Sequence, residues 1–483
     1  MERAVTRGMS RRLLIGAGAA GIAVAGTAGV VATGKGGAII RPGVARARAI
    51  AGDSRLPPRV DVVVVGGGNV GVLTALTLAE RGMKVALCEK GVIAGEASGR
   101  SLGYVDGQFL DPVKMPIIAR SKALWAGLNA RLGAETGFRR VGLLTLLPDD
   151  AGVDAARAWL ASVKGAQGVD ARLLTAAEAR RLDGGFDGTV AGALLQPSDG
   201  IAEPQLAAPA AALRLRQLGG IVLQGCAVRG FETAAGRISG VVTEKGPIGC
   251  SAAVLAGGVW SPVMARSLGL DLPQFMAFGS VVRVSPVAGP TLSLIAAGRN
   301  VLTRRNIQGG YDLCTGTGMA PVTWDAIRNI GRLRPALSNL WNEIDPALNL
   351  STFVSQAAIP HHWALDEPSP FEQNRIFMPQ TGNDALDRLI TQAPRSFAFL
   401  RKAKPLERWA GALTSTPDNM PVISAVDRYP GLFIGSGFYY GLTMGPAAGE
   451  ALADLVTGTT PQFDLSLYRL ERFSDGSPIR FRA

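Results

Sequence analysis

The sequence predicts an α/β protein whose core is a Rossmann-like nucleotide-binding domain with a central parallel sheet. Three features predict this fold. The β-branched run Val60–Val65 is typical of a buried parallel strand, a glycine-rich turn and a helix follow it directly, and a second strand over residues 84–88 ends at Glu89. With 47% apolar and 18% charged residues among 483, the chain can bury a large core, which excludes a disordered protein.

The first 51 residues have the layout of an export leader. A basic region ends in Arg11-Arg12, a weakly apolar stretch rich in Gly and Ala covers residues 13–34, and Ala49-Ile50-Ala51 is a small-x-small cleavage pattern. This layout resembles a twin-arginine signal, so we expect an exported, periplasmic protein. Two alternatives stay open: an uncleaved leader that anchors the protein in a membrane, or a basic tail without a targeting role.

The formal charge of +12 is concentrated in this leader. Residues 1–51 contain eight basic residues and one acidic residue, Glu2, which gives +7 and leaves +5 for the rest of the chain. After the leader, no block of Lys and Arg with interleaved aromatic residues occurs. We therefore expect no nucleic-acid partner.

Histidine and cysteine are scarce in this chain. The two histidines are neighbours, His361 and His362, and the four cysteines are scattered. This usage argues against a His-rich metal site and excludes a disulfide scaffold. We expect no metal.

The glycine-rich turn matches the dinucleotide fingerprint G-x-G-x-x-G in its full context. Gly66 permits a tight turn, Gly68 lets the backbone approach a pyrophosphate, and Gly71 lets the following helix, residues 72–81, pack closely on the strand. Glu89, 18 residues past Gly71, accepts hydrogen bonds from ribose hydroxyls and disfavours a 2′-phosphate, so NADP is not expected. The residues expected to contact the dinucleotide are Gly66, Gly68, Asn69, Val70, Gly71 and Glu89.

Later segments extend this pattern in a fixed order. They are Glu89-Lys90-Gly91, residues 95–103 (GEASGRSLG), 219–228, 252–261 (AAVLAGGVWS), 408–411 (RWAG), 416–423 (TPDNMPVI), and 431–438 followed by Gly441, Gly445 and Gly449. Together with the fingerprint they resemble the D-amino-acid oxidase-like (DAO) family of FAD-dependent oxidoreductases over residues 60–475. The chain departs from many relatives at Ser101-Leu102 and at Tyr439-Tyr440-Gly441.

The resemblance implies FAD as the cofactor. We expect noncovalent binding, because none of the four cysteines lies in a known flavin-linkage motif. No second fingerprint of this quality supports an NAD(P)H site. The resemblance adds these cofactor-binding residues to the fingerprint: Lys90, Ser98, Gly99, Arg100, Val228, Ala256, Gly257, Trp260, Gly437, Gly441, Leu442 and Thr443.

The resemblance also implies a substrate domain inserted into a discontinuous FAD-binding domain. The inserted domain is α+β and is built on a mixed or antiparallel sheet. Strand-like runs at residues 141–147 and 280–284, and a hairpin over residues 300–316 that turns at Gly309-Gly310, fit this insertion. The expected boundaries are residues 58–137, 199–275 and 406–466 for the FAD-binding domain, 138–198 and 276–405 for the substrate domain, and 467–483 for a C-terminal extension.

The implied reaction is oxidation of the C–N bond of an amino acid, with D-amino acids and secondary amines among the candidates. The flavin takes up a hydride, and the resulting imine hydrolyses to a 2-oxo acid. A substrate carboxylate calls for an arginine fork and a tyrosine hydroxyl. The substrate-site residues expected on this basis are Arg305, Tyr311, Tyr440 and Arg408.

Other functions stay open at this point. A 2-hydroxy acid would need the same arginine and tyrosine together with a base for its hydroxyl proton. The chain also fits a flavin-holding subunit of a hetero-oligomeric dehydrogenase. The expected electron acceptor is a quinone or oxygen, and both membrane association and a partner subunit are compatible with an exported protein.

Overall fold

The valine-rich run lies at the centre of a parallel sheet in the computed structural model. Strand β1 (Val62–Val65) is hydrogen-bonded to a neighbour on each side, and its first three valines have no solvent exposure. Successive side chains of a strand point to opposite faces, so Val62 and Val64 contact one hydrophobic core and Val63 contacts another. The predicted strand and parallel sheet are confirmed. In spatial order the sheet contains β21 (Val422–Ala425), β22 (Leu432–Ser436), β13 (Ala252–Leu255), β1, β2 (Val85–Cys88) and β9 (Ile221–Leu223), with β21 antiparallel to β22.

The structure describes residues 47–182, 185–186, 189–289, 294–297, 301–316, 318–340, 344–347 and 350–483. The predicted leader therefore lies outside the described residues up to residue 46. Just after it, the chain packs on the body of the protein: the Arg48 amide donates to the Gln205 carbonyl at 2.8 Å, and the Gln224 side chain donates to the Ile50 carbonyl at 2.9 Å.

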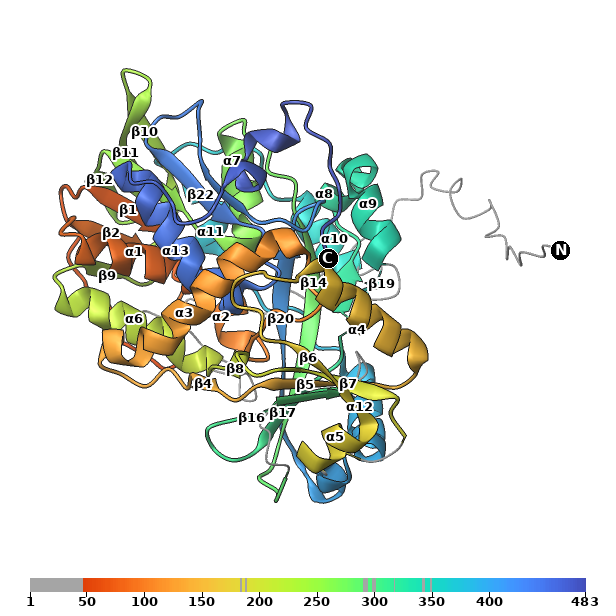
Figure 1. The fold of residues 1–483 in the computed structure, drawn as a ribbon. Helices are drawn as coiled ribbons and strands as arrows, with labels where there is room; N and C mark the ends of the chain where they lie inside the picture. Colours follow the sequence, from red (N-terminus) through yellow and green to blue (C-terminus); the bar gives the residue numbers. More distant parts are fainter. Residues whose placement is uncertain are drawn as a thin grey trace, which may run out of the picture. The chain divides into compact units, whose positions relative to one another are not determined.

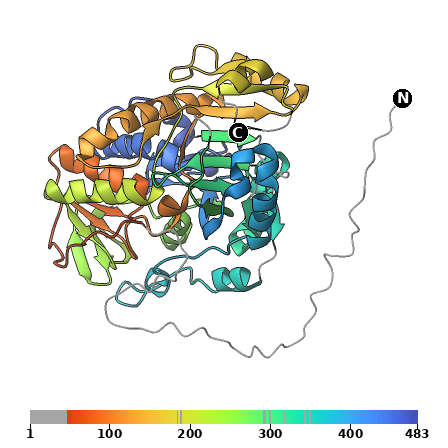
Figure 2. The ribbon, with the colours of Figure 1, turned by 90° about the horizontal axis from the view of Figure 1, so that it is seen from below.

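Helices from distant parts of the chain cover one face of the parallel sheet. Helix α1 (Asn69–Glu80) packs against α13 (Gly441–Thr457), and Figures 1 and 2 show these red and blue elements side by side. A Cβ atom at Gly449 would lie 2.9 Å from the Thr74 amide nitrogen, so glycine permits this close contact. Helices α3 (Met115–Leu132) and α6 (Pro204–Gln217) contribute to the same core.

The opposite face of the parallel sheet is covered by an antiparallel sheet and a short helix. The sheet comprises β10 (Val228–Ala234), β11 (Arg237–Thr243) and β12 (Gly246–Gly249), and the helix is α7 (Ser261–Ser267). Their buried side chains form the second core around Val63.

A second, mixed sheet is built from two separated parts of the chain, as predicted for the inserted domain. The expected hairpin forms, with Arg305 opposite Tyr311 and a turn at Gly309. Strand β20 (Pro405–Ser415) pairs along β14 (Phe275–Val284), so residues 406–415 join this sheet through their hydrogen bonds, although the predicted boundary assigns them to the FAD-binding domain. Within the described residues the order is β19 (Ile344–Ala347), β18 (Gly318–Pro321), β14 (Phe275–Val284), β17 (Tyr311–Cys314), β16 (Val301–Arg305), β15 (Leu294–Ala297), β5 (Leu143–Leu147), β7 (Gly192–Gln196) and β6 (Arg172–Thr175), with β20 (Pro405–Ser415) on β14.

The remaining elements are short or lie around the mixed sheet. A separate small sheet contains β3 (Tyr104–Val105), β8 (Gly200–Ile201) and β4 (Arg139–Arg140). The other helices are α2 (Ala97–Arg100), α4 (Asp150–Ser162), α5 (Ala176–Leu182), α8 (Trp324–Arg328), α9 (Ile330–Leu340), α10 (Leu350–Ala357), α11 (Pro370–Gln373) and α12 (Asn383–Ser396). No helix within the described ranges is both long and apolar enough to cross a membrane.

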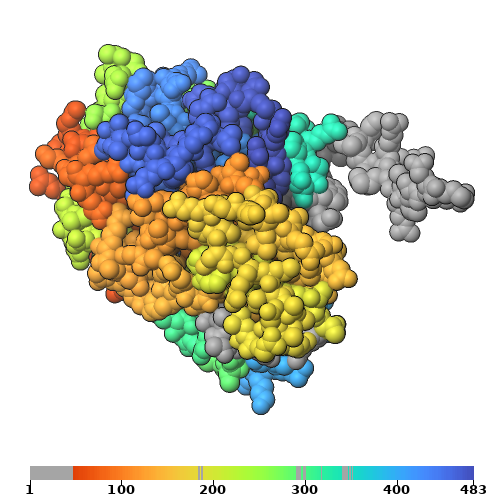
Figure 3. All heavy atoms as spheres, viewed as in Figure 1, coloured from red at the N-terminus to blue at the C-terminus, as the bar shows by residue number. Residues whose placement is uncertain are grey.

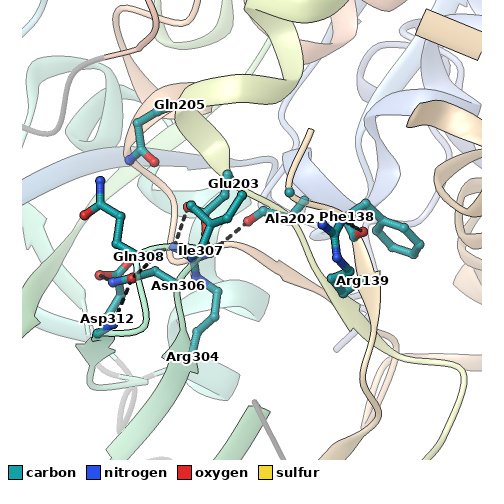
Figure 4. A network of polar contacts seen from close by, with 12 residues as sticks. Phe138, Arg139, Ala202, Glu203, Gln205, Arg304, Asn306, Ile307, Gln308 and Asp312 are labelled. Atoms are coloured by element: carbon teal, nitrogen blue, oxygen red, sulfur yellow. Dashed lines mark hydrogen bonds and ion pairs between the residues drawn. The ribbon is translucent and has the colours of Figure 1, made fainter. Parts of the chain in front are cut away.

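A buried arginine joins the two parts of the fold (Figure 4). Arg304 on β16 has no solvent exposure and donates to the Glu203 carboxylate at 2.7 and 3.2 Å. It also pairs with Asp312 on β17, which in turn accepts two hydrogen bonds from Arg283 at 2.7 and 2.9 Å. Because Glu203 directly precedes α6, this network ties the mixed sheet to the helices of the parallel sheet.

Replacing Arg304 with Met should destabilise the protein by about 3–5 kcal/mol, since Glu203 would keep a buried charge without its partner. The measurement is the thermal unfolding midpoint, followed by tryptophan fluorescence. The matched control is Arg305→Met, at the exposed last residue of the same strand, for which we expect a change within about 0.5 kcal/mol. Equal unfolding midpoints for the two variants would contradict a supporting role of Arg304.

Candidate functional site

One cavity of about 760 Å³ runs from the glycine-rich turn to the mixed sheet. At one end it is lined by Gly66–Val70, at the carboxyl ends of the parallel strands, where open α/β sheets bind ligands. At the other end it reaches β5, β14 and the hairpin β16–β17. The cavity therefore spans both predicted domains.

The glycine-rich turn has no room for larger side chains. Gly66 has a φ of +115°, and a Cβ atom there would lie 2.4 Å from the carbonyl oxygen of Ala256. A Cβ atom at Gly71 would lie 2.0 Å from the carbonyl oxygen of Gly66. Both positions allow the start of α1 to approach β1 and β13 closely, so the amide groups at this helix end can face an anionic ligand.

Asn69, the first residue of α1, has a polar side chain that is left unsatisfied by the described protein groups. It is 3% exposed, lines the cavity, and neither its Oδ1 nor its Nδ2 atom has a hydrogen-bond partner. Its backbone amide donates to Ser98 Oγ at 2.9 Å. A buried amide without partners is costly, so these atoms fit a ligand that supplies them.

Glu89 directly follows β2 and lies next to the glycine-rich turn. Its carboxylate accepts the Gly67 amide at 2.6 Å and the Gly91 amide at 2.7 Å. Burial raises the pKa of Glu89, while Lys90 and the two amides oppose that rise. Each carboxylate oxygen can accept more than one hydrogen bond, which leaves acceptor capacity for a ribose.

A polar network around Glu96 forms part of the cavity wall near the glycine-rich turn. Lys90 pairs with Glu96 at 2.6 Å and lies 4.7 Å above the ring of Trp260. Arg100 donates to the carbonyls of Phe377 at 2.8 Å and Gly95 at 2.7 Å. These contacts fix the positions of two cationic side chains along the cavity.

Most residues predicted to bind the cofactor line this one cavity. Gly71 and Gly99 do not; both are packing positions, and a Cβ atom at Gly99 would lie 2.2 Å from the Ala94 carbonyl oxygen. Those that line the cavity are Gly66, Gly68, Asn69, Val70, Glu89, Lys90, Ser98, Arg100, Val228, Ala256, Gly257, Trp260, Gly437, Gly441, Leu442 and Thr443.

The end of the cavity at the mixed sheet is mainly apolar. Leu146, Leu302 and Cys314 line it, and burial raises the pKa of the Cys314 thiol to about 12, so this thiol is neutral. Gln108 is fixed there by donating to the Leu143 carbonyl at 2.9 Å and accepting from Thr145 Oγ1 at 2.7 Å.

Of the four predicted substrate-site residues, only Tyr440 lines the cavity. Arg305 is exposed, Tyr311 is buried against Phe399 with ring centroids 4.8 Å apart, and Arg408 pairs with Asp387 at 2.6 Å. Arg305 and Tyr311 lie away from the cavity because successive side chains of a strand alternate between its two faces. These two residues share the face that is turned away from the cavity.

The opposite face of the same hairpin carries Leu302 and Cys314, which do line the cavity and which sequence analysis missed. The alternation of side chains along these strands could be seen in the sequence, but it does not show which face of the hairpin lines the cavity. Asp106 and Gln108, also missed, lie beyond the strand that follows the recognised segment, where no motif marks them.

The last residues of the chain contribute to the cavity as well. Phe481 and Ala483 line it, and buried Lys114 donates to the carbonyl oxygens of Arg482 at 2.9 Å and Ala483 at 2.8 Å. Burial lowers the pKa of Lys114 to about 7. Figure 3 shows the dark-blue segment at the end of the chain beside the orange and gold segments of the surface.

The residues present fit a dinucleotide whose ribose hydroxyl groups donate hydrogen bonds to a carboxylate. The turn at Gly66 and Gly68, the unpartnered amide of Asn69 and the carboxylate of Glu89 would hold it. Among the described residues, no three His, Cys, Asp or Glu side chains gather as metal ligands. The fold and the site thus define a dinucleotide-binding enzyme. The described residues of the chain contain no set of metal ligands.

Comparison with known proteins places the chain in a family. The model of the FAD dependent oxidoreductase (DAO) family matches residues 61–455, so the chain belongs to that family. Glycine oxidase from Pseudomonas putida is 26% identical, over 85% of this chain and 98% of that protein. Sarcosine oxidase subunit beta from Rhizobium meliloti is 27% identical, over 87% of this chain and 89% of that protein.

Solved structures agree with this assignment. L-amino acid deaminase from Proteus myxofaciens, in complex with anthranilate, is 33% identical with a TM-score of 0.86, over 90% of this chain and 98% of that one. The enzyme from Proteus vulgaris is 31% identical with a TM-score of 0.83, over 88% of this chain and 100% of that one. The chain is an FAD-dependent oxidoreductase of the group that oxidises C–N bonds of amino acids and amines.

Replacing Gly71 with Ala should prevent FAD binding, because the added methyl group would overlap the Gly66 carbonyl oxygen and push α1 away from the turn. The measurement is the flavin-to-protein absorbance ratio of the purified protein. The matched control is Gly127→Ala, a helical glycine in α3 with no atom within 4 Å of its added Cβ. This control should keep its FAD and gain about 0.5–1 kcal/mol of stability. A fully loaded Gly71→Ala protein would refute the steric argument.

Proposed function

We propose that the enzyme oxidises the C–N bond of L-amino acids with apolar side chains, giving an imine that hydrolyses to a 2-oxo acid and ammonia. The observation that carries the proposal is the continuity of one cavity from the dinucleotide end to the apolar end at Leu146, Leu302 and Cys314. The likeness to two L-amino acid deaminases supports the L configuration over the D form.

The chain's own residues would bind the substrate, orient it and exclude water. FAD, when bound, accepts the hydride from the substrate carbon that carries nitrogen. Tyr440, which caps α13 at the cavity, would contact the substrate, and the apolar wall would displace water from the reacting carbon. Noncovalent FAD binding is part of the proposal. It is supported by Cys88, the cysteine at the cofactor end of the cavity, because its hydrogen bond with Cys226 and its burial raise its pKa and keep it a neutral thiol.

A second candidate is a flavin-holding subunit of a larger dehydrogenase. It is supported by the likeness to sarcosine oxidase subunits. Gel filtration combined with an activity assay separates the two functions, because a subunit would be inactive alone. Oxidation of a 2-hydroxy acid is a further alternative, which the substrate panel described below tests.

We propose that the protein is exported to the periplasm by the twin-arginine route and acts there at the membrane surface. Support comes from Arg11-Arg12 in the leader and from exposed apolar side chains on α8 and α9. Trp324, Ile327 and Ile330 are 43–57% exposed and lie beside the exposed Arg328, a combination typical of interfacial helices. A quinone would then be the electron acceptor, with oxygen as the alternative.

Anaerobic mixing of the purified holoenzyme with apolar L-amino acids should bleach the flavin band at roughly 450 nm, since the flavin is the oxidant. The panel includes the matching D-amino acids, sarcosine and 2-hydroxy acids. Readmitted air should restore the band slowly if a quinone is the natural acceptor, and fast if oxygen is. Bleaching by 2-hydroxy acids alone would replace the proposed function, and bleaching by D-amino acids alone would correct its stereochemistry.

Replacing Arg11 and Arg12 together with Lys should keep the protein in the cytoplasm, because the paired arginines are the signal that the route reads. The measurement is fractionation into periplasm, membrane and cytoplasm, with the intact mass of each pool. A cleaved leader gives a shortened mass in the periplasm, whereas an anchor gives the full mass in the membrane. An unchanged distribution of the variant would rule out the twin-arginine route.

A further inference from the structure

A buried charged cluster lies next to Gly107, between the cavity residues Asp106 and Gln108, because a Cβ atom at Gly107 would lie 3.6 Å from Lys122 Nζ. Lys122 on α3 pairs with Asp199, which has no solvent exposure. The Nζ atom of Lys122 is also 3.3 Å from Ser198 Oγ. Asp199 also accepts from Gln196 Nε2 at 2.8 Å, while its second carboxylate oxygen has no partner among the described groups. The lysine is 6% exposed, so the pair is shielded from water.

Asp106 connects this cluster to the cavity. It follows β3 directly and lines the cavity, two residues before Gln108, which is fixed to the mixed sheet. Thr443 in the first turn of α13 contacts it twice: the Asp106 amide donates to Thr443 Oγ1 at 3.3 Å, and that hydroxyl lies 3.5 Å from Asp106 Oδ1. Asp106 is thereby held where the cofactor end of the cavity meets the apolar end.

The cluster has a charge that suits a cationic ligand. Asp106 and Asp199 both interact electrostatically with one lysine, Lys122, so two carboxylates share a single positive charge. Fully ionised, the three groups carry a net charge of −1 beside the cavity. The ammonium group of an amino acid would neutralise that charge.

Asp106 is also the cavity carboxylate that is available for proton transfer. The other side-chain carboxylates of the described lining are Glu89, which accepts two backbone amides, and Glu96, which pairs with Lys90. Neither His361 nor His362 lines the cavity. The thiol of Cys314 is held neutral by burial.

The proposed reaction requires a proton acceptor. An amino acid enters as an ammonium ion, whose nitrogen has no lone pair with which to form the C=N bond. We propose that Asp106 is the catalytic base that removes this proton, and that Lys122, which is held by its pairing with Asp199, is a positioning residue that sets the proton affinity of Asp106. This inference rests on the proposed function.

One N–H bond breaks, its proton moves to a carboxylate oxygen of Asp106, and its electron pair stays on nitrogen. The C–H bond then breaks, and its hydrogen leaves with the electron pair as a hydride, which FAD held at the glycine-rich turn would accept as the oxidant, while the nitrogen lone pair forms the C=N bond. Asp106 returns its proton to water after the imine has left.

The electrostatics of the site agree with this role. Burial raises the pKa of Asp106 to about 6, and Lys122 opposes that rise. Burial raises the pKa of Asp199 to about 7, with Asp106 adding to the rise and Lys122 opposing it. Tyr104 also faces Asp106, and burial keeps it protonated by raising its pKa. Asp106 is therefore ionised, and able to accept a proton, once the pH exceeds about 6.

The test is the limiting rate of anaerobic flavin bleaching by the best amino acid, measured from about pH 5 to about pH 9. For the wild-type holoenzyme we expect the rate to rise with pH to a plateau, with a midpoint near the pKa of Asp106, about 6. Asp106→Asn should lower the rate about 100-fold or more at neutral pH and remove that midpoint. The matched control is Asp154→Asn, the same change at a 72% exposed position, which should leave the profile unchanged.

Two further variants separate proton transfer from a structural role. Lys122→Met removes the opposite charge and should shift the midpoint to higher pH, whereas Lys122→Arg keeps that charge and should leave the midpoint near 6. Infrared difference spectra of wild-type protein against Asp106→Asn give the titration of Asp106 itself without turnover. An unshifted midpoint in Lys122→Met, or an Asp106→Asn enzyme with the wild-type rate and profile, would overturn the inference. A wild-type enzyme that no amino acid or amine bleaches would instead overturn the proposed function.

Discussion

The close approach of α1 to the ends of β1 and β13 is the steric condition on which the cofactor end of the cavity depends. Gly66 and Gly71 make it possible, because a side chain at either position would overlap a carbonyl oxygen. The approach directs the first amides of α1, together with the Asn69 side chain, toward the cavity. Glu89 can then lie within hydrogen-bonding distance of the same turn.

A second condition acts between the two sheets. The cavity is formed by residues from both, so its shape requires that they keep a fixed spacing. The buried network of Arg304, Glu203, Asp312 and Arg283 connects them with charge-assisted hydrogen bonds. Such networks are sensitive to the loss of one member, because the remaining charges have no access to water. The chemistry at the junction therefore depends on side chains that never touch the substrate.

The sequence predicted the parts of the fold that rest on local patterns. The valine strand, the glycine turn and Glu89 follow from backbone sterics and hydrogen bonding, and the motif order located the inserted mixed sheet. The hairpin β16–β17 was also predicted, but the face that lines the cavity was not, so Arg305 and Tyr311 were expected where Leu302 and Cys314 lie. Strand periodicity fixes which residues share a face, whereas tertiary packing decides which face is buried against the site. The cluster of Asp106, Lys122 and Asp199 could not be predicted either, because its members come together only in the folded chain.

The alternation along the hairpin has a consequence for how such an enzyme can diversify. Leu302 and Cys314 are cross-strand partners at the apolar end of the cavity, while Arg305 and Tyr311 occupy the other face. Exchanges that keep the combined volume of Leu302 and Cys314 can redistribute space within the pocket without opening a void. Substitutions at Arg305 leave the pocket untouched. Within one short hairpin, selection for new substrates and selection for surface properties can therefore act on separate residues.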